Sequence, residues 1–296
     1  MTDAIDALFE RQIQKWPLLA AGVQNLSRLR TRTVRIDWYD VFLRHIPHRI
    51  ASTTAAVDRE SVEKRQCFLC TKNLPPEEEG IPFDYGFSLY CNPFPILDRH
   101  LTIVHKDHRP QLIEGSVIAM LELARALPGY FVIYNGAACG ASAPDHLHFQ
   151  ACSRQLFPIE KDASSFAGSA ISGYGRRVIV LRDGAREALE DELLLCFRAL
   201  STVTGVMPEP LINIAAFYDK EAWTVYLFPR GKHRPQVFYT GEFTVSPAAI
   251  DLCGVFVVPV EKDFERISAA NIRSILEQVT LPERQFDEVR SFMERQ

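Results

Sequence analysis

The sequence predicts an α+β fold in which a mostly antiparallel sheet carries helices against one face and two related halves follow one another. The main observation is that the order helix, strand, strand occurs twice. It spans residues 112–127, 130–134 and 146–152, and again residues 185–203, 211–217 and 223–228. We interpret this as an internal duplication with a degenerate second copy. Chance recurrence of so common a pattern is the alternative.

The elements follow in order along the chain. Residues 1–66 predict helices and then extended chain, without a chemical motif. Alternating or apolar segments predict strands at residues 88–91 and 101–106, and Pro128-Gly129 ends the first periodic helix. Residues 264–279 and 284–294 predict helices, and the small, polar residues 163–175 predict a joint or mobile loop. We divide the chain into a lead-in (residues 1–66), a first half (67–162) and a second half (176–296).

The composition restricts the classes of function. The chain has 296 residues, 47% of them hydrophobic, and a net charge of −4, which allows a sizeable core in one or two domains. Without basic runs we expect no nucleic acid as a partner, and no apolar segment is long enough to cross a membrane. Asp3, Asp6 and Glu10 among apolar residues predict an amphipathic helix rather than a signal peptide, so we expect a cytoplasmic protein.

A loop of small residues leads directly into an alternating strand. From Asn135 the sequence reads NGAACGASAPDHLHFQ. Alternation places His146, His148 and Gln150 on one face, while the apolar residues between them take the other face. Glycines leave backbone N–H groups open to an anion, so the pattern predicts a nucleophile beside a phosphate cradle. A solvated sheet face and metal binding by both histidines are the alternatives.

The pattern Asn-x-Ala-Ala-x-Gly-x-Ser, followed by His-x-His-x-Gln, resembles the transferase branch of the histidine-triad (HIT-like) superfamily. That branch includes the galactose-1-phosphate uridylyltransferases, the diadenosine tetraphosphate phosphorylases and the GDP-hexose phosphorylases. A second segment, NPFPILDRHLTIV from Asn92, is similar to the family's nucleotide-binding strand pair. The resemblance covers residues 67–150 well. It implies a HIT-like fold whose site is built from two halves, within a monomer or across a homodimer.

The resemblance implies that His148 is the nucleophile and forms a nucleotidyl-histidine intermediate. A neutral imidazole suits this role when one nitrogen is free and the other holds its proton toward an acceptor, which we expect among the carbonyls of residues 136–138. Gln150 can orient phosphate oxygens but cannot serve as a base, which favours transfer or phosphorolysis over hydrolysis.

Three groups of residues are candidates for phosphate or nucleotide binding. Ser142 and the backbone near Gly140 are suited to hold phosphate oxygens, although Ser142 also suits a turn cap. The late basic residues suit a phosphate-bearing substrate, or a solvated loop. The full set comprises Asn135, Gly140 and Ser142 in the loop, Asn92, Phe94 and Arg99 near the first strand pair, and Arg230, Lys232 and Arg234 in the second half.

Cys67 and Cys70 have a metal-type spacing, and we expect the seven cysteines to be reduced thiols or metal ligands. One such pair is half a site. In the zinc-bearing uridylyltransferases further ligands lie at positions that match His108 and His146, so the resemblance implies a structural zinc ion. A redox pair and two buried thiols are the alternatives.

The leading hypothesis is a nucleotidyltransferase or phosphorylase that acts on a nucleoside diphosphate sugar by a ping-pong mechanism. Phosphorolysis of dinucleoside polyphosphates is the alternative within the class. A non-catalytic nucleotide-binding or regulatory protein is the alternative outside it, and a hydrolase is a third. Leu147 and Phe149 replace the proline and glycine of the uridylyltransferases, which leaves the base, the sugar and the acceptor (phosphate or sugar phosphate) open.

Overall fold

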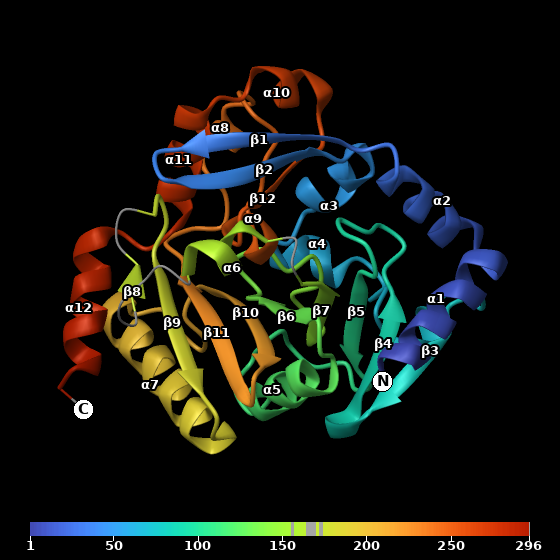
Figure 1. Ribbon diagram of the computed structural model, residues 1–296, viewed down its shortest axis with the longest axis horizontal. Helices are drawn as coiled ribbons and strands as arrows, with labels where there is room; N and C mark the ends of the chain where they lie inside the picture. The colour runs from blue at the N-terminus through green and yellow to red at the C-terminus, as the bar shows by residue number, and fades with distance from the viewer. Residues whose placement is uncertain (155–156, 164–169, 172–173, 296) are drawn as a thin grey trace.

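The computed structural model describes residues 1–154, 157–163, 170–171 and 174–295 (Figure 1). Part of the expected joint at residues 163–175 therefore lies outside the described residues. A nine-stranded antiparallel sheet forms the centre of the molecule. In spatial order it contains β3 (Gly80–Phe83), β4 (Phe87–Cys91), β5 (Leu101–His105), β7 (His148–Ser153), β6 (Tyr130–Asn135), β10 (Ile212–Asp219), β11 (Ala222–Pro229), β9 (Val178–Asp183) and β8 (Ala170–Ile171).

Each half of this sheet has the same topology. Outward from the β6–β10 junction, the first half continues as β7, β5, β4 and the second as β11, β9, β8. Each half has one helix at the same point of the chain, α5 (Val117–Ala126) before β6 and α7 (Arg186–Thr204) before β10. The two halves are thus related. β11, the counterpart of the motif strand β7, contains no histidine, which agrees with a degenerate second copy.

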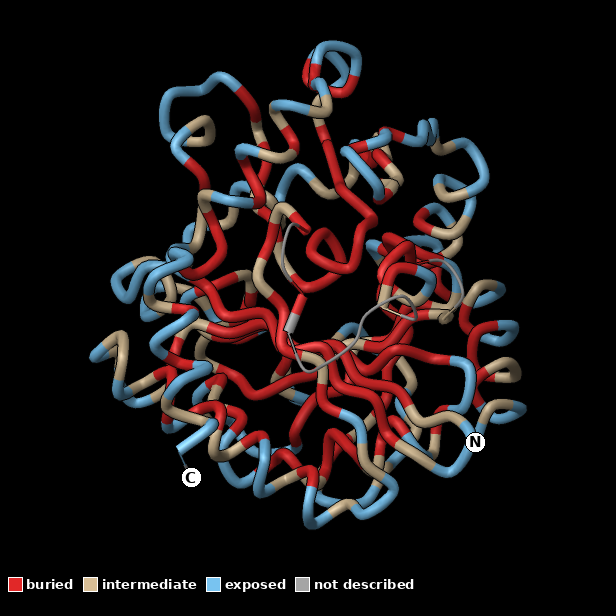
Figure 2. Tube along the Cα trace, turned by 60° about the vertical axis from the view of Figure 1, so that its left-hand side comes forward, coloured by how far each residue is buried: buried red, intermediate tan, exposed pale blue. Residues whose placement is uncertain are grey.

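The helices α1 (Thr2–Lys15), α5, α7 and α12 (Glu283–Met293) pack against one face of the sheet and enclose the larger apolar core. We expected helices on one face only, but the opposite face is also covered. A second sheet of β1 (Arg30–Ile36), β2 (Tyr39–His45) and β12 (Val255–Val258) lies there over a second core (Figures 1 and 2). The helices α6 (Pro158–Ala163), α9 (Ala249–Leu252) and α11 (Ala269–Val279) lie on the same side. β12 runs parallel to β2, so the lead-in and the C-terminal part of the chain share one sheet.

The remaining helices lie along the chain as follows. The longer ones are α1 (Thr2–Lys15), α2 (Pro17–Leu26), α11 (Ala269–Val279) and α12 (Glu283–Met293). The short ones are η1 (Pro47–Arg49), α3 (Ile50–Thr53), α4 (Arg59–Glu63), η2 (Thr71–Asn73), η3 (Asp84–Gly86), α6 (Pro158–Ala163), α8 (Gln236–Tyr239), α9 (Ala249–Leu252) and α10 (Glu261–Arg266). Among the described residues, none of the helices has the length and apolarity needed to span a bilayer.

Two element boundaries differ from the sequence prediction. The helix expected from residue 112 begins only at Val117, because Gly115 takes a left-handed conformation (φ +75°). The motif strand begins at His148 instead of His146, since the His146 N–H bonds to the carbonyl of Ala143 in a turn. In both cases a local turn, which hydrophobic periodicity does not register, replaces the first residues of the element.

Candidate active site

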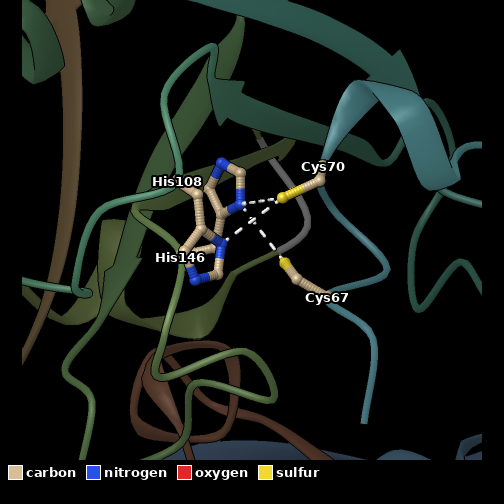
Figure 3. Close-up of side chains that lie close together, drawn as sticks. All are labelled: Cys67, Cys70, His108 and His146. Atoms are coloured by element: carbon tan, nitrogen blue, oxygen red, sulfur yellow. Dashed lines mark hydrogen bonds between the residues drawn. The ribbon is translucent and has the colours of Figure 1, made fainter. Parts of the chain in front are cut away.

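β7 carries the two polar residues on which the site is centred. Leu147 and Phe149 are fully buried in the core beneath the sheet. His148 and Gln150 point to the opposite face, where both line a cleft. His146 precedes the strand and points instead toward Cys67 and Cys70 (Figure 3).

The imidazole of His148 is held in one tautomer. Its Nδ1 lies 2.8 Å from the carbonyl oxygen of His146, so Nδ1 carries the proton and Nε2 keeps its lone pair. The acceptor is therefore His146 and not a carbonyl of residues 136–138, because the strand turns the ring back along its own chain. Burial lowers the pKa of His148 to about 4, although the bond to the His146 carbonyl opposes this shift.

Gln111 fixes the backbone of His148 from below. Its side-chain oxygen accepts the His148 N–H at 2.8 Å, and its Nε2 donates to the His148 carbonyl at 3.0 Å. The same Nε2 donates to the Asn135 carbonyl at 2.9 Å, which ties the start of the small-residue loop to the motif strand. Gln111 was not singled out in the sequence, because it follows a proline in an unpatterned loop.

The Gln150 side chain is oriented by a second buried histidine, His100. His100 Nδ1 accepts the Ile96 N–H at 3.1 Å, so its Nε2 carries the proton and donates to Gln150 Oε1 at 3.1 Å. The Gln150 amide therefore directs its NH₂ group, a donor, away from His100. Burial lowers the pKa of His100 to about 3, which keeps this ring neutral. No local pattern distinguishes His100 in the sequence.

The small-residue loop is tied to the second half of the molecule. The Asn135 side-chain oxygen accepts from Asn213 Nδ2 at 2.8 Å and from the Ala249 N–H at 3.0 Å. Gly140 has φ +122°, and a Cβ there would lie 2.7 Å from the Cβ of Ala248. The loop thus needs a glycine for its close approach to α9, and Ser142 follows at the edge of the cleft.

The cleft has a volume of about 560 Å³ and lies over β4, β5 and β7. Asn92 lines it with its side chain held by Thr102 Oγ1 (3.0 Å) and the Phe94 N–H (2.9 Å). Phe94 and Phe68 also line it, and each remains more than 40% exposed. Arg99 is not among the lining residues; it forms an ion pair with Asp6 beside α1.

The three basic residues predicted in the second half lie in different places in the structure. Arg230 is 2% exposed, and its guanidinium donates to Asn213 and to the carbonyls of Val279, Lys232 and His233, so it has a structural role. Lys232 borders a different hollow beside α12. Only Arg234 reaches the site.

Arg234 borders a smaller cavity of about 60 Å³, which shares Ser142 and Gln150 with the cleft. Arg49, which sequence reasoning missed, lines both spaces, and its Nη1 donates to the Phe94 carbonyl at 3.2 Å. Burial lowers the pKa of Arg49 to about 10, so it stays charged at neutral pH. Two guanidinium groups therefore lie beside the amide and hydroxyl of the site.

Four side chains gather beside the cleft into a possible metal site (Figure 3). The ligand atoms of Cys67, Cys70, His108 and His146 all lie within 4.8 Å of one another. Cys67 Sγ is 3.3 Å from His146 Nδ1, and Cys70 Sγ is 3.3 Å from His108 Nδ1. His146 Nε2 lies 2.7 Å from the carbonyl oxygen of His105, which leaves Nδ1 free to bind a metal.

Comparison with known proteins finds matches in sequence and in structure. Residues 8–153 match a domain of unknown function (DUF4922), and residues 155–294 match the "GDPGP1-like, C-terminal domain". No curated protein matches the chain. The structure is similar to that of the yeast Ap4A phosphorylase Apa2, with a TM-score of 0.60, 16% identity and coverage of 93% of this chain and 97% of that one.

Apa2 in complex with AMP (TM-score 0.61) and in complex with Ap4A (0.58) matches over the same shares, each at 15% identity. At this identity the likeness establishes the fold. The match of residues 155–294 to a GDPGP1-like C-terminal domain and the shared fold agree with the resemblance to the histidine-triad-like nucleotidyltransferases and phosphorylases.

Proposed function

We propose that the protein transfers a nucleotidyl group from a nucleoside diphosphate sugar to a phosphate-bearing acceptor through His148. The observation that carries this proposal is the His148 ring, whose Nδ1 is held by the His146 carbonyl while Nε2 is left as a nucleophile in a cleft. An uncharged imidazole in this orientation can attack phosphorus without first losing a proton.

In the first step, Nε2 of His148 forms a bond to the α-phosphorus, and the bond from that phosphorus to the sugar phosphate oxygen breaks. The positive charge that develops on the ring is stabilised by the His146 carbonyl on Nδ1. The Gln150 NH₂ group and Ser142 hold the non-bridging oxygens. In the second step, an acceptor oxygen attacks the same phosphorus, and the phosphorus–nitrogen bond breaks to restore His148.

The small cavity supports inorganic phosphate as the acceptor. Arg49 and Arg234 supply positive charge there, and Ser142 and Gln150 connect it to the cleft that holds His148. Its volume of about 60 Å³ suits a phosphate group better than a whole sugar phosphate. A second candidate is phosphorolysis of dinucleoside polyphosphates, which the structural likeness to the yeast Ap4A phosphorylase favours.

The four-residue cluster supports a structural zinc ion. Tetrahedral coordination with ordinary zinc–sulfur and zinc–nitrogen bonds places sulfur and nitrogen ligands about 3.5 Å apart, and the observed separations are 3.3–3.6 Å. The donor set of two thiols and two imidazoles suits zinc. A bound ion would hold the Cys67 loop against the start of β7, and His148 would do the chemistry.

Intact-protein mass spectrometry tests the covalent step. The chain is mixed with ADP-, GDP- and UDP-sugars and with diadenosine tetraphosphate, without an acceptor. We expect a mass increase of one nucleoside monophosphate, absent from His148→Ala and retained in His45→Ala, a matched control away from the cleft. Added phosphate should remove the adduct. Binding of every donor without an adduct would contradict transfer and favour a non-catalytic nucleotide-binding protein.

A further inference from the structure

A carboxylate lies in the cleft. Glu78 follows the turn at Pro75 and precedes β3, and its side chain lines the cleft. Among the described residues, none forms a hydrogen bond or ion pair with this carboxylate, whereas its neighbour Glu79 pairs with Arg11 and Lys15. Burial raises the pKa of Glu78 to about 7. A half-buried carboxylate of this kind in a cleft can accept hydrogen bonds from the donors of a ligand.

The strand register places Glu78 at the opposite end of the cleft from the reacting atoms. Gln150 pairs with Thr102, Thr102 with Tyr90, and Tyr90 with Gly80, in one row across four strands. Adjacent strands are about 4.8 Å apart, so Gly80 lies roughly 14 Å from Gln150. Glu78 is two residues before Gly80. A nucleotide whose phosphate lies at His148 would extend its base along this row.

The walls between these ends suit a flat aromatic ring. Tyr90, Phe94, Phe68 and Trp16 line the cleft together with Leu74 and Pro75. A Cβ at Gly80 would lie 2.5 Å from the Tyr90 ring. Because Gly80 has no side chain, the Tyr90 ring can lie directly over β3. Arg65, which also lines the cleft, lies over the Phe68 ring at 4.9 Å from its centre. Nucleobases bind between such groups by stacking, whatever their sequence of donors and acceptors.

We propose that Glu78 is the residue that selects the base and that it selects guanine. This inference rests on the proposed function for the position of the phosphate. A carboxylate offers two acceptors, and guanine presents two adjacent donors on its Watson–Crick edge, N1–H and the N2 amino group. Adenine presents one donor beside the N1 acceptor, so it pairs only with the protonated carboxyl of Glu78, whereas guanine pairs with the carboxylate.

The test is calorimetric binding of GDP, IDP and ADP to the full-length chain carrying His148→Ala, in which no transfer can occur. IDP keeps N1–H but lacks the N2 amino group, so we expect affinity to fall from GDP to IDP to ADP. Adding Glu78→Gln should weaken GDP binding by about 10- to 100-fold and strengthen ADP binding, because an amide offers one acceptor and one donor. Glu79→Gln is the matched control and should leave the order unchanged.

Three outcomes would overturn the inference. The first is an unchanged GDP affinity in Glu78→Gln. The second is an equal loss of affinity for all three nucleotides, which would show that the carboxylate binds the ribose. The third is a preference for ADP over GDP when Glu78 is present. Binding in the His148→Ala background does not depend on turnover. A missing covalent adduct would therefore contradict the proposed function while leaving a guanine preference that depends on Glu78 intact.

Discussion

A single hydrogen bond decides what the Gln150 amide offers to a phosphate. Because His100 Nε2 donates to Gln150 Oε1, the amide nitrogen is the group left for substrate oxygens. The proton on His100 is placed in turn by the Ile96 N–H on its other nitrogen. A neutral donor held in this way can stabilise charge on phosphate oxygens, but it cannot pass a proton to water or a leaving group.

Replacing Gln150 by histidine should therefore change the reaction. In Gln150→His we expect release of nucleoside monophosphate to water without acceptor, because an imidazole can exchange a proton there. Transfer to phosphate should fall about tenfold or more, since the oriented amide donor is lost. Both rates can be followed by chromatography of the products. Gln150→Glu, which has neither a donor nor a suitable proton at neutral pH, is the control, and hydrolysis no faster than in the unmodified protein would contradict this account.

At the scale of elements, the Cys67–Cys70 turn connects the four-residue cluster with the cleft. Its sulfur atoms face His108 and His146, while Phe68, between the two cysteines, lines the cleft. Arg65, just before the turn, forms a 2.6 Å ion pair with Asp145, the residue preceding His146. A change in how these cysteines are held should therefore alter the binding of a ligand in the cleft.

We expect the purified chain to hold about one zinc ion, and Cys70→Ser to lose it, because a hydroxyl is a poor zinc ligand. The melting temperature should fall by on the order of 5 °C as the loop loses its anchor. Elemental analysis and thermal unfolding check both effects. Cys91→Ala, at a buried cysteine outside the cluster, should lower stability without changing the zinc content. A metal-free native chain would contradict the zinc proposal.

The sequence predicted those parts of the site that lie in local patterns. Alternation identified His148 and Gln150, and the spacing of Cys67 and Cys70 identified the beginning of the four-residue cluster. His100, Glu78 and Arg49 were missed, because each comes near the site only through strand pairing or packing with distant segments. Arg230 was interpreted as a phosphate contact because local sequence does not reveal that a charged side chain is buried.

At the scale of the whole molecule, contacts between distant segments of the chain were likewise not predicted from the sequence. The helix–strand–strand order was visible in both halves, but the covering sheet was not, because β12 pairs with β2 from the other end of the sequence. The halves are further joined through Glu209. Its carboxylate accepts the Tyr134 hydroxyl at 2.7 Å and the Ile113 N–H at 2.7 Å, both in the first half.

This junction should make stability depend on pH. Burial raises the pKa of Glu209 from 4.5 to about 7, although its two hydrogen bonds oppose the shift. Below about pH 4.5 the carboxyl is protonated in both the folded and the unfolded state. Between about pH 4.5 and pH 7 the unfolded state releases the proton while the folded state keeps it, so the free energy of unfolding falls as the pH rises. The loss amounts to up to about 3 kcal/mol and is complete above pH 7.

Glu209→Gln should remove this contribution, so the free energy of unfolding should fall less between pH 5 and pH 8 than in the unmodified chain. Urea unfolding at a series of pH values measures it. Glu242→Gln, at an exposed carboxyl, is the control. Parallel pH profiles for Glu209→Gln and the unmodified chain would show that the carboxyl ionises freely at the junction.

The pairing of β12 with β2 has a consequence for how the protein is made on the ribosome. β1 and β2 are synthesised early, yet their sheet cannot be completed until Val258 at the end of β12 has left the exit tunnel. Arg49, close after β2, and Val257, in β12, both border the small cavity beside the cleft. The nascent first half can thus form the motif strand, but the small cavity is assembled only after β12 has been synthesised.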